Sequence, residues 1–313
     1  MNKVLLGMGS FAMDTRIVCP ALPKEDSFAL VSGEQVAPGG SCANMLVTFA
    51  GLGGVSRMIA KIGDDAAGTA FRDTLAKDGV DNTLLLVKPG GVSLHTYVMV
   101  TPEGAHSIFV NPGNSMMDLK PRELSPELLD GVDIFYSDLF PAAAAVAVAG
   151  MCRQKGIPVV ICLQCPPSFM HALGVTDEEI AQAISLADLF ISGREGYFEL
   201  TGCADYREGA IEAHRRFEPC AGVVCTAGAE GAYWLHKSGA LSVPAMPVAA
   251  VDSTGAGDSF FGALLYSYYC LGESRLEALR FAAGAGALKC TVPGPRLKVP
   301  EGQLRAFVAA TGG

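Results

Sequence analysis

A glycine-rich turn that ends in an aspartate is the feature of this sequence best suited to chemistry. The segment Asp252-Ser-Thr-Gly-Ala-Gly-Asp258 runs into Ser-Phe-Phe-Gly-Ala-Leu-Leu, which predicts an apolar helix beginning at the turn. The first N–H groups of a helix have no intrahelical acceptor and lie at the positive end of its dipole, so Gly255, Ala256 and Gly257 predict a phosphate site. Asp258 beside them can accept a proton from an alcohol, which predicts phosphoryl transfer to a hydroxyl group. The structural alternative for Asp258 is a helix cap.

The same segment resembles the second signature of the PfkB (ribokinase-like) family of carbohydrate and nucleoside kinases. That signature reads Asp-Thr-Thr-Gly-Ala-Gly-Asp, and only Ser253 differs here. A second block resembles the first signature of the family, namely Gly39-Gly-Ser-Cys-Ala-Asn44 with Leu52-Gly-Gly54 and Ile62-Gly-Asp-Asp-Ala-Ala-Gly68. The resemblance extends over nearly the whole chain. It implies an ATP- and Mg²⁺-dependent phosphotransferase with an alcohol acceptor and Asp258 as its general base.

The N-terminal block is the predicted acceptor site. A glycine pair, Gly39 and Gly40, lets a polar ligand approach the backbone closely, and Asn44 offers a donor and an acceptor to hydroxyl groups. The resemblance adds Ser41 and implies that Asp14 binds acceptor hydroxyls, a role suited to a carboxylate. The structural alternatives are an ordinary turn before a helix for the glycine pair and an exposed loop position for Asp14.

Two segments are predicted to bind the nucleotide. Thr226, Gly228 and Gly231 resemble the family's Thr-x-Gly-x-x-Gly turn beside the nucleotide phosphates, although an ordinary β-turn produces the same bare pattern. Ser192 and Glu195 resemble its Asn-x-x-Glu segment, in which the glutamate organises the water shell of Mg²⁺. Serine reaches less far than asparagine, so the phosphate contact of Ser192 stays open.

The cations are expected to differ in how they are held. Mg²⁺ resists dehydration, so ATP phosphates and water are its predicted main ligands. Many relatives also hold a monovalent cation, K⁺, beside the Gly-Ala-Gly-Asp turn. The matching positions here are Asp252, Thr254 and the loop from Lys289 to Lys298, which includes Gly294. Lys298 replaces a small polar residue of the family. Its ammonium would either repel K⁺ or stand in for it.

Alternating strands and helices are expected to position these residues. Apolar runs predict buried strands, and stretches with apolar residues three or four positions apart predict helices. The pattern predicts a three-layer α/β sandwich with a mostly parallel sheet, in a single ribokinase-like domain over residues 1–313. The expected strands are 4–9, 132–136, 157–162, 187–191 and 221–225, and the expected helices are 43–52, 66–77, 142–154, 177–186 and 206–217.

Segments 11–36 and 92–110 break this alternation. The second contains Thr-Tyr-Val-Met-Val and His-Ser-Ile-Phe-Val on either side of Thr101-Pro-Glu-Gly104, which predicts a β-hairpin. We expect the two segments to form a small β-sheet lid over the carboxyl ends of the main strands, where open α/β sheets bind ligands. A small sheet with one apolar face needs a partner, and in the family that partner is often a second lid, which predicts a homodimer.

The composition of the chain argues against several classes of partner and location. The 313 residues carry a net charge of −9 with scattered Lys and Arg, which argues against nucleic acid or an anionic membrane as partner. No apolar run reaches the roughly 20 residues of a membrane span, so a cytoplasmic location is expected. The ten cysteines are expected to be buried hydrophobes in a reducing compartment. Cys162 and Cys165 form a lone Cys-x-x-Cys with no second pair.

The acceptor is predicted to be a small uncharged sugar, because no Arg/Lys cluster for a phosphorylated acceptor can be placed in the site. A nucleoside is the alternative, since Phe11, Tyr97 and Phe109 lie in the lid segments and could stack on a base. A non-catalytic sugar- and nucleotide-binding protein is a rival of another class, but binding alone would not require Asp258. A dinucleotide-dependent oxidoreductase lacks its glycine fingerprint.

Overall fold

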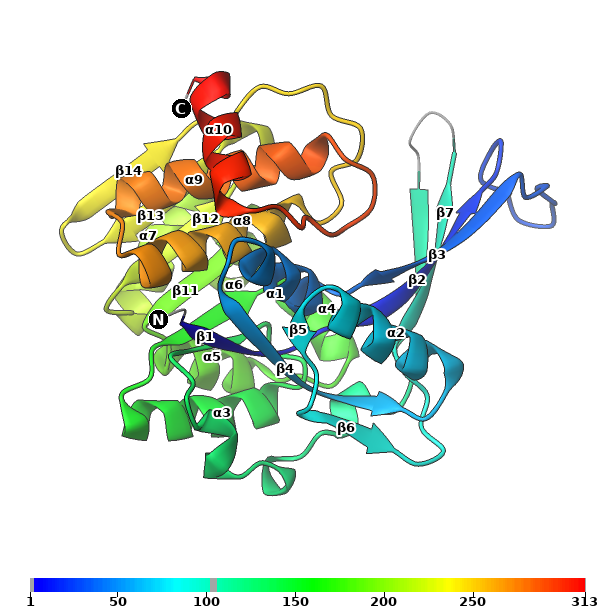
Figure 1. The fold of residues 1–313 in the computed structure, drawn as a ribbon, viewed down its shortest axis with the longest axis horizontal. Helices are drawn as coiled ribbons and strands as arrows, with labels where there is room; N and C mark the ends of the chain where they lie inside the picture. Colours follow the sequence, from blue (N-terminus) through cyan, green and yellow to red (C-terminus); the bar gives the residue numbers. More distant parts are fainter. Residues whose placement is uncertain (1–2, 102–105, 313) are drawn as a thin grey trace.

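The main sheet of the protein runs through the whole body of the molecule. The computed structural model describes residues 3–101 and 106–312, and Figure 1 shows its course. The 10-stranded main sheet has the order β14-β13-β12-β11-β10-β9-β1-β4-β5, with β6 paired to β4. The strands from β12 to β5 are parallel, and β13 and β14 are antiparallel. Their bounds are β1 (Val4–Met8), β4 (Val55–Gly63), β5 (Val80–Asp81), β6 (Leu85–Lys88), β9 (Ile134–Ser137), β10 (Val159–Leu163), β11 (Leu189–Gly193), β12 (Gly222–Thr226), β13 (Ala232–His236) and β14 (Gly239–Val243).

Helices cover both faces of this sheet. The helices α3 and α5 pack together on one side, whereas α1, α8 and α9 pack together on the other (Figure 1). Their bounds are α1 (Ser41–Gly51), α2 (Ala66–Lys77), α3 (Ala142–Lys155), α4 (Pro167–Ala172), α5 (Asp177–Ser185), α6 (Arg194–Thr201), α7 (Tyr206–Phe217), α8 (Ala256–Leu265), α9 (Arg275–Cys290) and α10 (Glu301–Thr311), and a π-helical turn, Tyr266–Leu271, follows α8. The predicted three-layer α/β sandwich with a mostly parallel sheet is confirmed.

Strand β4 shows where the sequence pattern failed. It is a central strand between β1 and β5, yet the apolar-run criterion did not predict it. The reason is Lys61, whose mostly buried ammonium donates to Glu123 Oε1 at 2.7 Å and lies 3.4 Å from Asp118 Oδ2. A paired lysine can lie in a buried strand, but its partners are far away in the sequence and invisible to a local pattern.

Strands β2 (Ala12–Val18), β3 (Gly33–Gly39), β7 (His95–Val100) and β8 (His106–Asn111) form a separate sheet with the order β3-β2-β7-β8. This sheet, which we call the lid, projects from the body (Figure 1). The predicted hairpin is confirmed, since β7 and β8 pair antiparallel, whereas β2 and β7 pair in parallel. Residues 102–104 of its expected turn lie outside the described residues.

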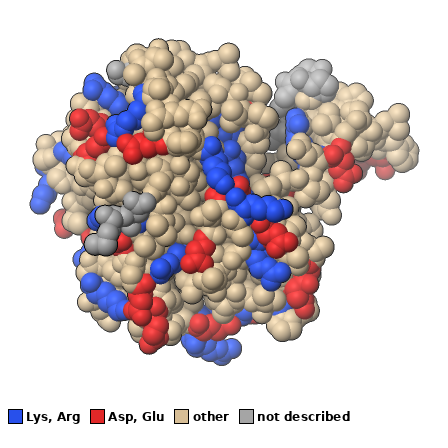
Figure 2. Space-filling model, viewed as in Figure 1, with Lys and Arg blue, Asp and Glu red and all other residues tan. Residues whose placement is uncertain are grey.

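The surface carries small groups of both charges. On the face in Figure 2, acidic and basic side chains alternate among uncharged residues. Within residues 3–101 and 106–312, no helix is both long and apolar enough to cross a membrane.

Candidate active site

Two helices that pack face to face bring the predicted base and the predicted acceptor residue together. Helix α1 carries Asn44 and helix α8 carries Asp258 in its first turn. Their close approach depends on Gly262, because a Cβ atom added there would lie 2.6 Å from the Met45 carbonyl oxygen. As a result, Asn44 Nδ2 donates a hydrogen bond to Asp258 Oδ2 at 2.9 Å. These residues lie 214 positions apart in the sequence, so only the fold creates this contact.

Burial makes Asp258 a stronger base than an ordinary carboxylate. Its side chain is only 6% exposed, and this desolvation raises its pKa to about 6. Hydrogen bonds from Asn44 and Ser41, and the nearby positive charge of Lys289, oppose the rise. Asp258 is therefore ionised at neutral pH and yet basic enough to accept a proton, which is the compromise that a general base requires.

The turn before α8 is the predicted anion site, and its two glycines differ in their surroundings. Gly255 adopts φ +77°, and a Cβ atom there would lie 1.9 Å from the Pro295 carbonyl oxygen, so this position requires glycine. At Gly257 the situation is reversed, since among the described residues no atom lies within 4 Å of an added Cβ atom. The first helical turn is therefore open at Gly257, whereas Ala256 N already donates to the Ser253 carbonyl at 3.1 Å.

Asp14 lies on β2, the lid strand next to the body. Thr96 Oγ1 on β7 donates to Asp14 Oδ1 at 2.6 Å, and partial burial raises the pKa of Asp14. A Cβ atom at Gly39 would lie 2.0 Å from Asp14 Oδ2. One reason for glycine at this position is therefore room for the carboxylate of Asp14, a reason that sequence reasoning did not give.

The second glycine of the pair has a structural role. Gly40 has φ +90°, and an added Cβ atom would lie 2.2 Å from Phe11 Cα. It precedes α1, whose first residue, Ser41, bonds to Asp258 and lowers its pKa. The structural alternative, a turn that starts a helix, thus holds for Gly40 without excluding a ligand nearby.

Arg296 belongs to this site and was missed by sequence reasoning. Its Nε donates to Asn44 Oδ1 at 3.3 Å, and its Nη1 lies 2.7 Å from Asp78 Oδ2. An amide that accepts from arginine through its oxygen must present its NH₂ group elsewhere, here to Asp258. Arg296 Nη2 is buried and has no hydrogen-bond partner among the described residues. No local motif marks Arg296, because its partner Asn44 is 252 positions away.

Asp138 is a second missed residue. It follows β9 directly, is fully buried, and accepts hydrogen bonds from Ser10 N at 2.9 Å and Ser10 Oγ at 2.5 Å. Desolvation raises its pKa to about 7, hydrogen bonds from Ser10 oppose this, and the charge of Asp258 raises it further. An acidic residue immediately after a predicted buried strand was the available signal, because parallel strands end at the ligand-binding edge.

The predicted nucleotide residues lie at the carboxyl ends of β11 and β12. Gly193 pairs with Thr226, and a Cβ atom at Gly193 would lie 3.7 Å from Glu195 Oε2 and 4.0 Å from Thr226 Oγ1. Glu195 is largely exposed and pairs with Arg194 at 2.9 Å. The sheet therefore brings the Thr226 and Glu195 segments together, as expected if both segments bind the same nucleotide.

The remaining residues of these two segments differ in accessibility. Ser192 is fully buried, and its hydroxyl donates to the Leu163 carbonyl at 2.8 Å, so its side chain is engaged inside the protein. Gly228 has φ +56° with open space around it, whereas Gly231 has φ +93° and packs against the Val243 carbonyl. Gly228 can border a ligand, while Gly231 shapes the turn.

The predicted monovalent-cation residues are held together by the Asp252 carboxylate. Asp252 Oδ1 accepts from Thr254 N at 2.9 Å, and Asp252 Oδ2 accepts from Gly294 N at 2.9 Å. Lys289 Nζ donates to the Asp252 carbonyl at 2.8 Å. Lys298, which the sequence placed here, instead donates from a half-exposed position to the Lys77 carbonyl at 2.9 Å. The expectation that the Lys298 ammonium lies at the cation site is wrong.

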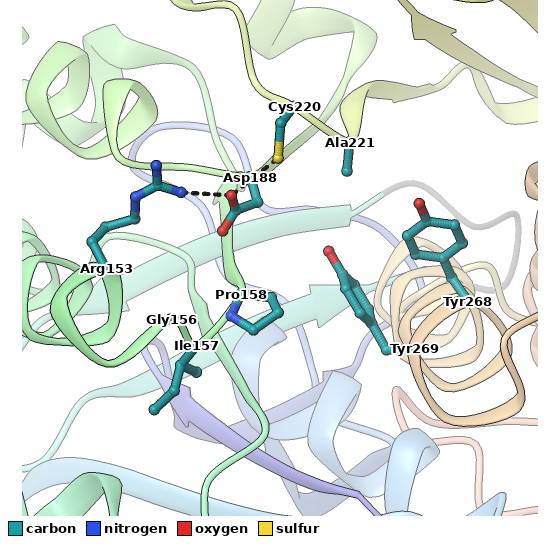
Figure 3. Close-up of a pocket in the computed structure, with 9 residues that line it drawn as sticks. All are labelled: Arg153, Gly156, Ile157, Pro158, Asp188, Cys220, Ala221, Tyr268 and Tyr269. Atoms are coloured by element: carbon teal, nitrogen blue, oxygen red, sulfur yellow. Dashed lines mark hydrogen bonds and ion pairs between the residues drawn. The ribbon is translucent and has the colours of Figure 1, made fainter.

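Other features do not join the site. Cys162 of the Cys-x-x-Cys pair is buried within β10, and the part of the chain that the structure describes holds no cluster of His, Cys, Asp and Glu suited to a metal ion. A cavity of about 410 Å³ lies at the amino ends of β10, β11 and β12, the edge opposite to the site (Figure 3). Its carboxylate, Asp188, pairs with Arg153 at 2.6 Å and accepts from Val159 N at 2.8 Å.

Comparisons with known proteins agree with this geometry. Residues 4–302 match the family model described as pfkB family carbohydrate kinase. Aminoimidazole riboside kinase of Salmonella typhimurium is 29% identical over 87% of this chain and 88% of its own, and probable fructokinase-5 of Arabidopsis thaliana is 30% identical over 88% and 89%. The structure of Arabidopsis thaliana ribokinase complexed with ribose and ATP has a TM-score of 0.84 and 23% identity, and covers 98% of this chain and 99% of that one.

The fold is therefore ribokinase-like, and it belongs to a transferase that phosphorylates a hydroxyl group of a sugar or nucleoside. The chain belongs to the pfkB family of carbohydrate kinases.

Proposed function

We propose that this kinase transfers the γ-phosphate of ATP to a hydroxyl or hydroxymethyl group of a small uncharged sugar. The observation that carries the proposal is the Asn44–Asp258 hydrogen bond at the N-terminus of α8. It supports the proposal because a buried carboxylate of raised pKa at a helix N-terminus suits a reaction in which a hydroxyl group meets a phosphoryl group.

Each side chain then has a definite task. Asp258 accepts the hydroxyl proton as the new O–P bond forms and the bond to the leaving ADP oxygen breaks. The N–H groups of Gly255 and Gly257 stabilise negative charge on the phosphoryl oxygens, while Ala256 N donates to the Ser253 carbonyl at 3.1 Å. Asp14 and Asn44 orient the acceptor hydroxyls. Glu195 would hold the water shell of Mg²⁺, and the metal ion would neutralise phosphate charge when bound.

The lid aromatics argue for a sugar rather than a nucleoside. Phe11 is fully buried and packs on Phe71 at 4.8 Å between ring centroids, so it belongs to the core. Thr96 pairs with Asp14, and the next residue, Tyr97, pairs with Phe109. Successive residues of a strand point to opposite faces, so both rings lie on the lid face turned away from Asp14. The stacking argument for a nucleoside is thereby lost.

A turnover panel tests the proposal. We expect ADP release from ATP and Mg²⁺ to rise with a free sugar, and to stay at background with sugar phosphates and nucleosides. Nucleosides belong in the panel because a relative acts on aminoimidazole riboside, and sugar phosphates belong because Arg296 Nη2 is buried without a partner. Turnover with a nucleoside alone would replace the sugar assignment, and silence on every acceptor would favour a non-catalytic binding protein.

We also propose that the protein is a homodimer joined through its lid. Thr15 pairs with both Val36 and Tyr97, and Tyr97 pairs with Phe109, so these side chains form one row across the sheet. Val36, Tyr97 and Phe109 are 57%, 43% and 58% exposed. An apolar row of this kind on a small sheet is stable when it packs on a second copy.

Light scattering on the gel-filtered protein should therefore give about twice 32.5 kDa. Phe109→Glu should lower this mass to that of a monomer, since the charge would be buried without a partner. Ile211→Glu is the matched control, because Ile211 is 51% exposed on α7, outside the lid. A wild-type protein that elutes as a monomer at micromolar concentration would refute the dimer.

A further inference from the structure

Lys289 is a buried cation that the proposed chemistry does not use directly. It lies in the last turn of α9, and the residue is 0% exposed. Its Nζ donates to the Asp252 carbonyl at 2.8 Å and to the Val292 carbonyl at 3.1 Å. An ammonium removed from water must be compensated, and here main-chain carbonyl oxygens supply the hydrogen bonds. Carbonyl oxygens are also the groups that replace the hydration shell of K⁺ in proteins.

The carbonyls bound by Lys289 lie in the same loops as the residues expected to hold a monovalent cation. Asp252 and Thr254 belong to the segment before the anion turn, and Gly294 belongs to the loop that begins after α9. The Asp252 carboxylate joins these segments by accepting from Thr254 N and Gly294 N. A cation at this junction has the function of tying both segments together, and the lysine already supplies that positive charge.

We propose that the Lys289 ammonium takes the place of the monovalent cation, so that this kinase does not require K⁺. The residues present do not fit a K⁺ site, because an ammonium already occupies the carbonyl of Asp252. Lys289 is then a positioning residue. It holds the Asp252 and Val292 segments, and the adjacent Pro295 carbonyl in turn packs against Gly255 of the anion turn.

The neighbouring packing supports this role. The Cys290 carbonyl, next to Lys289, accepts from Val251 N at 2.7 Å and Asp252 N at 3.1 Å. One helical turn earlier, a Cβ atom at Gly286 would lie 3.3 Å from the Ala256 carbonyl, so α9 packs directly on the start of α8. Movement at the end of α9 is therefore transmitted to the N–H groups of the anion turn.

The test is a chemical rescue. Wild-type kcat/KM should be the same with and without KCl up to about 100 mM, with choline chloride keeping the ionic strength constant. Lys289→Ala, measured without K⁺, should lose about 10²-fold in kcat/KM, since a small misplacement of the anion turn has that effect. Added K⁺ should restore about tenfold or more of this loss, because it can occupy the vacated carbonyls, whereas choline is too large.

Thermal unfolding provides a readout that does not depend on turnover. KCl should raise the Tm of Lys289→Ala above its value in choline chloride, and should leave the Tm of the wild type unchanged. Lys298→Ala is the matched control, because Lys298 is half-exposed and donates to the Lys77 carbonyl; its kcat/KM and Tm should stay indifferent to K⁺.

The kinetic arm rests on the proposed function, and the Tm arm does not. Silence on every acceptor would count against the proposed function, and the Tm arm would still decide the role of Lys289. K⁺ activation or K⁺ stabilisation of the wild type would overturn the inference. A folded Lys289→Ala that ignores K⁺ in both readouts would overturn it as well. If that variant unfolds without K⁺, Lys289→Met keeps the side-chain volume without the charge, and its Tm should rise with KCl.

Discussion

Asp258→Asn should lower kcat by about 10² to 10⁴, the range for removal of a general base. Asparagine has the shape of aspartate, and its Oδ1 can still accept the hydrogen bond from Asn44 Nδ2, which is 2.9 Å long in the wild type. The substitution removes the basicity and the negative charge but keeps the shape of the side chain. The KM values for ATP and the acceptor should therefore change little, and steady-state kinetics with the best acceptor of the panel measures both effects.

Stability separates this result from simple damage to the fold. Burial holds the pKa of Asp258 at about 6, above the roughly 3.9 of an unfolded aspartate. Between these values the native state binds more protons than the unfolded state, so the free energy of unfolding falls as pH rises through this window and stays lowered at neutral pH. Asparagine does not ionise, so its burial does not lower the free energy of unfolding in this way. The Tm of Asp258→Asn at neutral pH should therefore equal or exceed that of the wild type.

The pH profile supplies a third readout of the same residue. Asp258 accepts a proton only when ionised, so log kcat/KM should rise with pH up to about 6 and then level off. Asp138, whose pKa is about 7, is the neighbouring carboxyl group that could produce a similar limb. The limb should persist in Asp138→Asn and disappear in Asp258→Asn. A variant at Asp258 that keeps wild-type kcat would rule out its role as the base.

Gly257→Ala should lower kcat/KM by about 10² to 10³, the range for loss of one oxyanion-type donor. Among the described residues no atom lies within 4 Å of an added Cβ atom at this position, so the methyl group meets nothing in the free protein. In the complex it would occupy the space in which the phosphoryl oxygens must approach the N–H groups. The folded protein should be as stable as the wild type, or slightly more so, because alanine favours the helix over glycine.

Gly255→Ala provides the contrast. Its Cβ atom would lie 1.9 Å from the Pro295 carbonyl oxygen, and φ is +77°, so this variant should lose both Tm and activity. The pair separates a glycine needed for the ligand from a glycine needed for the turn. Wild-type kcat/KM in Gly257→Ala would mean that phosphate does not bind against this turn.

Much of this protein could be predicted from local patterns. Helices α2 and α7 were expected at their observed bounds, 66–77 and 206–217, because residues three or four positions apart share one helical face. The five predicted buried strands all exist as β1, β9, β10, β11 and β12, each shifted by a few residues at most. The Gly-Ala-Gly-Asp turn could be recognised for a similar reason, because phosphate binding at a helix start uses consecutive residues.

Other features depend on contacts between segments that are distant in the sequence, so local patterns could not predict them. Lys61 interrupts the apolar run of β4, and local patterns therefore did not predict a central strand there. The tertiary structure pairs Lys61 with Glu123, which explains how the lysine can be buried. Arg296 and Asn44, 252 positions apart, meet because the loop after α9 packs on α1, where Thr48 Oγ1 donates to the Leu297 carbonyl at 3.0 Å. The ammonium that binds the Asp252 carbonyl is that of Lys289, whereas that of Lys298 binds the Lys77 carbonyl, and sequence position alone could not distinguish them.

The division has a physical basis. Helix periodicity, turn chemistry and strand burial arise from interactions over a few residues, so local patterns were enough to predict the fold class and to propose Asp258 and the turn before it as site residues. Hydrogen bonds between side chains act over about 3 Å and depend on which way each chain segment turns. The orientation of Asn44, the burial that tunes Asp258 and the position of Lys289 are of that kind, and the packing of α1, α8 and α9 decided them.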